Sequence, residues 1–201
     1  MKHPDDRFSW IQDDYVELEN TLQNNPLVND LMHQKNVGNP YDKNNNQPDA
    51  RYVNLKYIIE DEWIFFSNYL GPKAKEFNYC PNISAVFFWH QTNTQIRIKA
   101  KIFKSSSEFS DTHFEQRDKG KNILAITSKQ SNKIDSYNNF IDLYEQASKK
   151  ISDTQKRPNY WGGYSFKPYY FEFWQGHNQR INKREAYILK KDNWENFILQ
   201  P

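Results

Sequence analysis

Alternating apolar and polar positions predict two β-hairpins in the first half of the chain. Over residues 51–60 the apolar side chains fall on every second position, which is typical of a strand with one buried face. Residues 63–68 follow after a short turn and complete the first hairpin. The second hairpin joins residues 84–90 to residues 95–104, where apolar and basic residues alternate as in an antiparallel strand with one solvated face.

The remaining pattern predicts more strands and a few helices. Three further strands are expected at residues 169–175, 185–190 and 194–199. Helical spacing predicts helices over residues 15–32 (broken at Pro26), 73–79, 107–117 (ended by Gly120) and 134–151. Short strands joined by hairpins indicate a mainly β fold with helical insertions (α+β), arranged as an antiparallel barrel. Residues 1–50 are expected to form an N-terminal helix and a variable polar loop, and residues 51–201 to form one domain.

Composition fits a single intracellular domain with an aromatic core. The chain has 201 residues, of which 16% are aromatic. A net charge of +2 without a basic block gives no reason to expect nucleic acid. The single cysteine, Cys80, excludes an internal disulfide and fits a reducing compartment. No apolar run approaches the roughly 20 residues of a membrane span, and residues 1–7 lead into no secretory signal, so we expect a cytoplasmic protein.

The chain offers cations rather than a metal site or a nucleotide-binding loop. Its five histidines are scattered, and neither a Gly-x-Gly-x-x-Gly nor a Walker pattern is present. His113 and Arg117 are four residues apart on one helical face, and Lys121 follows just past the helix. Such groups suit a phosphate, although each taken alone also fits a solvated surface. The other cationic candidates are Arg51, Lys56, Lys73, Arg97, Arg180 and Arg184.

Ordered motifs resemble a known family. Residues 159–164 read NYWGGY, 172–176 read EFWQG, 180–184 read RINKR, and the chain closes with WENFILQP. The pyridoxine 5′-phosphate oxidase family carries W-G-G-[YF], E-F-W-Q-G, R-L-H-D-R and a final Trp-containing strand that ends in Pro. Upstream, RYVNLK, FFSNY, QIRI and SKQS resemble its R-x-V-L-L-K, F-[YF]-[TS]-N-Y, R-Q-V-R-V and S-x-Q-S in the same order. The resemblance covers about residues 51–201.

The resemblance implies a homodimer of split barrels with FMN bound between the subunits. Arg51 and Lys73 fall where the family holds the FMN phosphate, which requires cations. The flat flavin ring requires apolar and amide neighbours that tune it. The other cofactor-binding residues that the resemblance implies are Val53, Leu55, Lys56, Phe66, Ser67, Gln95, Gln130, Ser131, Trp174 and Arg184.

The substrate-binding positions depart from the family pattern. The residues implied to bind the substrate phosphate are Lys56, His113, Arg117 and Lys121, where the family has Lys, Tyr, Arg and Ser. The two replacements add potential positive charge. Arg180 and Asn182 match the substrate-ring pair R-x-H without its histidine, and Pro72 replaces a second phosphate arginine. The family's first strand is not recognisable between residues 27 and 49.

These features favour an FMN-dependent oxidase of pyridoxine or pyridoxamine 5′-phosphate in vitamin B6 metabolism. The implied reaction passes hydride from substrate C4′ to flavin N5, with O2 as the final acceptor, and Arg180 and Asn182 are the implied catalytic residues. One alternative is a divergent FMN oxidoreductase that acts on another ring substrate, as in phenazine biosynthesis. Another is a flavin-binding protein without catalysis. The expected partners are a second copy of the chain and a small phosphorylated substrate.

Overall fold

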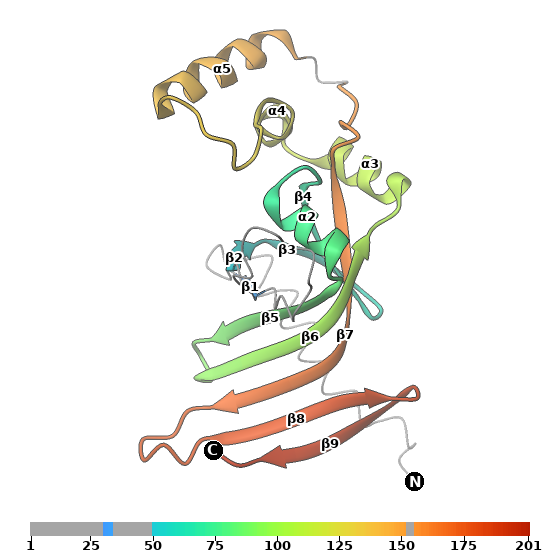
Figure 1. Cartoon of the computed structure of the whole chain (residues 1–201), viewed down its shortest axis with the longest axis vertical. Helices are drawn as coiled ribbons and strands as arrows, with labels where there is room; N and C mark the ends of the chain where they lie inside the picture. Colours follow the sequence, from blue (N-terminus) through green and yellow to red (C-terminus); the bar gives the residue numbers. More distant parts are fainter. Residues whose placement is uncertain (1–29, 34–49, 152–154) are drawn as a thin grey trace.

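The computed structural model describes residues 30–33, 50–151 and 155–201, which form one curved antiparallel sheet and four helices (Figure 1). Helices α3, α4 and α5 lie beyond one end of the sheet, and strands β8 and β9 lie at the other. The strands are β1 (Asp30–His33), β2 (Ala50–Val53), β3 (Leu55–Ile59), β4 (Glu62–Asn68), β5 (Asn82–Trp89), β6 (Thr94–Lys104), β7 (Trp161–Gln175), β8 (Lys183–Lys190) and β9 (Asn193–Leu199). The helices are α2 (Pro72–Tyr79), α3 (Ser107–Gln116), α4 (Lys119–Thr127) and α5 (Tyr137–Lys150).

Strand β7 is where the sheet branches. The main path of the sheet runs β2-β1-β5-β6-β7-β4-β3. One edge of β7 pairs with β6, while its other edge pairs first with β4, over residues 161–166, and then with β8, over residues 170–175. Strands β2 and β3 end the path, so the sheet of a single chain is open. The predicted mainly β, antiparallel architecture with helical insertions is confirmed, whereas barrel closure is not seen within one chain.

Aromatic side chains fill the core, as the composition predicts. Phe65 is fully buried and stacks on Tyr164, with ring centroids 5.7 Å apart. Trp63 packs against Phe87 at 5.5 Å and joins β4 to β5. A second buried cluster of Phe114, Ala125 and Trp161 lies where α3 and α4 meet the start of β7. Large rings each bury a great deal of surface, so a low apolar fraction still supports a packed interior.

Strand β1 was not predicted. The helical pattern over residues 15–32 and the polar loop from residue 33 both extend into Asp30–His33, which is a strand. It pairs with β2 on one edge and with β5 on the other. Four residues carry too little periodicity to identify a strand, and two neighbouring strands provide the hydrogen bonds that decide the conformation. The rest of the predicted helix and loop lies outside the described residues.

Helix α4 and the first half of β7 were also missed. The sequence predicts that a helix stops at Gly120, but α3 ends at Gln116 and α4 begins at Lys119. The side chain of Asp118 accepts a hydrogen bond from Lys121 N and starts the new helix, so Gly120 lies in its first turn. Strand β7 begins at Trp161, ahead of the predicted residue 169. Pro168 is accommodated inside it, opposite Ala100, where the register of the β6–β7 pair shifts.

Candidate active site

A buried lysine at the start of α2 forms the first part of the site. Lys73 is 7% exposed and its Nζ donates to Ser67 Oγ at 2.7 Å and to Gln130 Oε1 at 3.4 Å. Ser67 lies on β4, and Gln130 lies in the turn after α4. Burial, and then the positive charge of Arg51, lower the pKa of Lys73 to about 8, while Glu76 acts in the opposite direction. The fold therefore brings together four of the predicted cofactor-binding residues: Arg51, Ser67, Lys73 and Gln130.

This group fits a phosphate dianion. Two cations stand beside a hydroxyl and an amide, which can each contribute a hydrogen bond. A lysine that is taken out of water without a fully compensating carboxylate is costly to keep charged, and a bound anion offsets that cost. Pro72, which occupies the first turn of α2, supplies no side-chain donor. Charge on this side of the site therefore comes from Lys73 and Arg51.

A second cationic group lies on the other side of β4. The positive charges of Lys121 and Arg117, after burial, lower the pKa of Lys56, so the three residues lie close together. Arg117 donates from Nη1 to Lys121 O at 2.7 Å and to Asn122 Oδ1 at 3.2 Å. Its guanidinium lies 4.7 Å from the centre of the Trp161 ring. Two α4 contacts and one aromatic face thus fix the direction of this arginine.

His113 joins this group but does not add the predicted positive charge. Its Nδ1 is 2.8 Å from Tyr57 Oη, and its ring stacks on Phe66 with centroids 3.6 Å apart. Burial, followed by the charges of Arg117 and Lys56, lowers the pKa of His113 to about 4. Without a bound anion the imidazole is therefore neutral at physiological pH, and it does not act there as the third cation that the sequence suggests.

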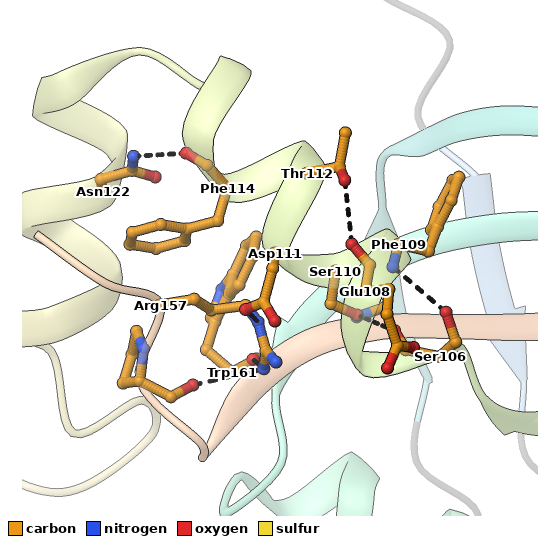
Figure 2. A network of polar contacts seen from close by, with 12 residues as sticks. Ser106, Glu108, Phe109, Ser110, Asp111, Thr112, Phe114, Asn122, Arg157 and Trp161 are labelled. Carbon is orange, nitrogen blue, oxygen red and sulfur yellow. Dashed lines mark hydrogen bonds and ion pairs between the residues drawn. The ribbon is translucent and has the colours of Figure 1, made fainter. Parts of the chain in front are cut away.

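Hydrogen bonds around α3 hold the helices that carry this group (Figure 2). Arg157 forms an ion pair from Nε to Asp111 Oδ1 at 2.7 Å and donates from Nη1 to Trp161 O at 2.6 Å. Asn122 Nδ2 donates to Phe114 O at 2.8 Å and ties α4 to α3. The arginine side chain is mostly buried while Asp111 is half-exposed, and the two contacts together anchor α3 on the start of β7.

A third set of predicted residues gathers around a buried carboxylate at the far end of β7. Gln95 pairs in register with Trp174, and Trp174 pairs with Arg184. Glu172 is 2% exposed and accepts hydrogen bonds from Arg184 Nε at 2.9 Å and Nη2 at 2.8 Å. Its other oxygen accepts from Arg97 Nη1 at 3.1 Å. The carboxylate therefore fixes the orientation of Arg184, whose Nη1 also donates to Gln200 O at 2.9 Å.

The remaining predicted residues are less closely connected. Arg180 is exposed with φ of 61°, and Asn182 Oδ1 accepts from His177 N at 3.0 Å in the same turn. Leu55 is buried in the main core and Val53 packs against that core. Ser131 follows Gln130 with φ of 70°. The sequence prediction missed Tyr57, Trp161 and Glu172 as residues of the site, although two of them stand inside the motifs NYWGGY and EFWQG.

Curated relatives identify the family. Pyridoxine/pyridoxamine 5′-phosphate oxidase of Rippkaea orientalis is 36% identical over 157 residues, which cover 77% of this chain and 74% of the relative. The enzyme of the same name from Haemophilus influenzae is 36% identical over 155 residues, with the same coverage. The chain belongs to the pyridoxine/pyridoxamine 5′-phosphate oxidase family. The members of this family are oxidoreductases, and membership supports FMN as the expected cofactor.

A family model also matches the chain, and two solved structures share its fold. The family description "Pyridoxine 5′-phosphate oxidase C-terminal dimerisation region" matches residues 161–201. PhzG from Burkholderia lata, solved with tetrahydrophenazine-1-carboxylic acid, shares the fold with a TM-score of 0.79 at 18% identity, covering 98% of this chain and 94% of its own. A pyridoxamine 5′-phosphate oxidase-related, FMN-binding protein from Nostoc punctiforme gives a TM-score of 0.72 at 10% identity, with 97% of each chain covered.

The described residues contain neither a membrane-spanning helix nor a cluster of metal ligands. No helix within the described ranges is long and apolar enough to cross a membrane. Nor do the histidine, cysteine and acidic side chains of residues 30–33, 50–151 and 155–201 form a group that could hold a metal ion.

Proposed function

We propose that this chain is an FMN-dependent oxidase that acts on pyridoxine or pyridoxamine 5′-phosphate. One observation carries the proposal: two cationic groups flank neighbouring residues of β4. Ser67 contacts Lys73 in the first group, and Phe66 stacks on His113 in the second. A cofactor phosphate and a substrate phosphate would each occupy one group, which brings both molecules to the same strand.

Each residue of the site has a proposed role. Arg51, Lys73, Ser67 and Gln130 hold the FMN phosphate, and Lys56, Arg117 and Lys121 hold the substrate phosphate with His113 as a neutral partner. Arg180 and Asn182 cover the substrate ring. When bound, FMN would supply the redox chemistry, a hydride transfer from substrate C4′ to flavin N5 with O2 as the final acceptor. The chain itself positions the two molecules and supplies the positive charge.

The proposed active form is a homodimer of split barrels. Ser67 pairs with Gly162, and Trp174 lies twelve positions further along β7. That is about 40 Å measured along the strand at roughly 3.3 Å per residue, and it separates Lys73 and its partners from Trp174 and Arg184 within one chain. We call Arg51, Ser67, Lys73 and Gln130 the Lys73 group, and Gln95, Trp174 and Arg184 the Trp174 group. We infer that the two groups of one chain bind different FMN molecules. A second copy of the chain would supply the missing group to each site.

The domain assignment and location follow from this proposal. Residues 51–201 form the FMN-binding domain, whose last strands take part in dimerisation, and the segment before residue 51 adds β1 to the sheet. The single cysteine in the sequence supports a cytoplasmic location.

Anaerobic reduction tests the function. When pyridoxamine 5′-phosphate is added to the FMN-loaded protein without oxygen, the yellow flavin absorbance should bleach, and air should restore it. Arg117→Ala should slow bleaching roughly ten- to a hundredfold at subsaturating substrate, because a charge-assisted contact to the phosphate is lost. Lys119→Ala, which changes an exposed cation at the start of α4, is the matched control. Absence of bleaching by either vitamin B6 phosphate would refute this function.

The neutral state of His113 favours a second candidate, an oxidoreductase of a ring substrate that carries no phosphate. Because His113 is neutral, the group of Lys56, Arg117 and Lys121 has one cation fewer than the sequence suggests. This group therefore also suits a carboxylate, which carries less negative charge than a phosphate dianion. The PhzG structure holds a ring acid of this kind. Bleaching by such a carboxylic acid, combined with no response to either vitamin B6 phosphate, would support this candidate over the first.

A further inference from the structure

His113 has one ring nitrogen engaged and the other open. Nδ1 lies 2.8 Å from Tyr57 Oη. Nε2 makes no hydrogen bond to any residue in the described ranges, although it belongs to the cluster that contains Lys56 and Arg117. A neutral imidazole has one donor and one acceptor nitrogen, so the partner of Nδ1 decides what Nε2 offers to a ligand.

The ring is held in a fixed orientation. Phe66 covers one face of the imidazole at 3.6 Å, with the two planes only 12° apart. The Tyr57 ring stands against it edge-on, at 5.4 Å and 87°, and Tyr57 is packed in turn against Phe109 at 5.3 Å. Rotation of the imidazole would break both the stack and the hydrogen bond.

Charge decides the direction of the Tyr57–His113 hydrogen bond when an anion is bound. If Nδ1 carried the hydrogen, Nε2 would present a lone pair to the anion and repel it. If Tyr57 donates its hydroxyl hydrogen to Nδ1, Nε2 carries the hydrogen and can donate to the anion. A tyrosine hydroxyl is a good hydrogen-bond donor. When Tyr57 donates to Nδ1, the hydroxyl, the imidazole and the anion each have a favourable hydrogen-bond partner.

We propose that Tyr57 is a positioning residue of the anion site that acts through His113. Its hydroxyl donates to Nδ1, holds the imidazole as the Nε2–H tautomer, and makes this histidine a neutral donor that faces the substrate anion beside Lys56 and Arg117. The inference rests on the proposed function for its identification of these groups as the substrate-phosphate site. It adds a specificity element, because a neutral donor contributes hydrogen bonding without adding charge.

The tautomer is measurable in the intact protein. In the ¹⁵N-labelled, FMN-loaded full chain, nitrogen chemical shifts should show His113 with hydrogen on Nε2 and a hydrogen-bonded lone pair on Nδ1. Addition of inorganic phosphate as the probe should shift the Nε2–H signal, while Nδ1 remains unprotonated. An Nδ1–H tautomer in the phosphate-bound protein would overturn the inference, whether or not any variant folds.

A double-mutant cycle tests whether Tyr57 acts through His113. Tyr57→Phe should weaken phosphate binding roughly three- to tenfold and mix the His113 tautomers, because one hydrogen bond is lost. In a His113→Phe background, which keeps an aromatic ring on Phe66, the same change should alter phosphate affinity less than about twofold. FMN affinity should be unchanged in both cases. Tyr137→Phe, an identical change at a tyrosine that is 75% exposed, is the matched control.

The outcomes separate this inference from the proposed function. Equal effects of Tyr57→Phe with and without His113 would mean that Tyr57 acts by another route, and the inference would fail. If the protein does not oxidise vitamin B6 phosphates but the tautomer and the cycle behave as expected, the function fails and the role of Tyr57 stands for another anion.

Discussion

Lys73 concentrates the electrostatics of the proposed cofactor site in one side chain. It is nearly buried, its hydrogen-bond partners are a hydroxyl and an amide, and Arg51 adds a second positive charge nearby. A bound phosphate would relieve both the burial of the ammonium group and the repulsion. Lys73 and Arg51 should therefore both control FMN binding.

FMN affinity should depend on pH through Lys73. Without a bound anion the pKa of Lys73 is about 8, and a phosphate raises it, so binding takes up a proton when the pH exceeds that value. Affinity should therefore change little between about pH 7 and pH 8, where the FMN phosphate is already a dianion, and fall by up to roughly tenfold per pH unit above about pH 8. Quenching of flavin fluorescence on binding measures this. Lys73→Arg stays charged over the whole range and should show no such decline. A pH-independent affinity in the unmodified protein would contradict the assignment.

Removal of either phosphate cation should weaken FMN binding. Arg51→Ala and Lys73→Ala each delete a charge-assisted hydrogen bond, worth about 1.5–3 kcal/mol, so affinity should fall roughly ten- to a hundredfold. Lys75→Ala removes an exposed lysine from the same helix and should leave affinity unchanged. Titration of the three apoproteins with FMN gives the comparison. Unchanged affinity in both Arg51→Ala and Lys73→Ala would remove this cluster from the cofactor site.

At the scale of elements, close contact between β7 and its neighbours depends on glycine. A Cβ built on Gly162 would overlap Tyr69 Oη and lie 2.9 Å from Tyr69 Cζ. Tyr69 is not free to move, since its hydroxyl donates to Gly163 O at 3.0 Å and Lys104 lies over its ring. The strand can pass this ring only without a side chain.

Gly162→Ala should therefore destabilise the fold. We expect a loss of about 1–3 kcal/mol from overpacking, which in a chain of this size lowers the unfolding temperature by roughly 2–10 °C. Gly71→Ala is the matched control, since its added Cβ comes no closer than 3.3 Å to Gln130 Oε1. The unfolding temperatures of the Gly162→Ala and Gly71→Ala proteins, both without FMN, measure this difference. Equal stability would mean that Tyr69 yields without cost.

Elements with a clear periodicity could be predicted from the sequence, and elements decided by distant partners could not. The β5–β6 hairpin follows directly from alternation, with Ile98 buried and Lys99 exposed. Strand β1 depends on two other strands, and α4 on the cap from Asp118. In the site, the resemblance grouped Arg51 with Lys73, and Lys56 with Arg117 and Lys121, and the structure brings the members of each group close together. The resemblance did not reveal that His113 is neutral, because burial and the charges of Arg117 and Lys56 set that state in three dimensions.

For the whole molecule, the distance between the Lys73 and Trp174 groups predicts complementation between subunits. Lys73→Ala and Trp174→Ala should each fail to retain FMN alone. In an isologous dimer built from a random mixture of the two, about half of the dimers are mixed and each has one intact site, so FMN binding should recover to about a quarter. Unfolding the two variants together, refolding them and measuring bound flavin tests this. No recovery would show that both groups serve the same site within one chain.

The position of β7 has a consequence for synthesis on the ribosome. Strands β4 and β6 do not pair with each other, since both pair with β7, which is encoded about a hundred residues after β4. Until residue 175 has left the exit tunnel, the β3–β4 and β5–β6 hairpins stay separate and each keeps an open edge. We expect the nascent chain to depend on chaperones over this interval and to fold late, when β7 joins the two hairpins.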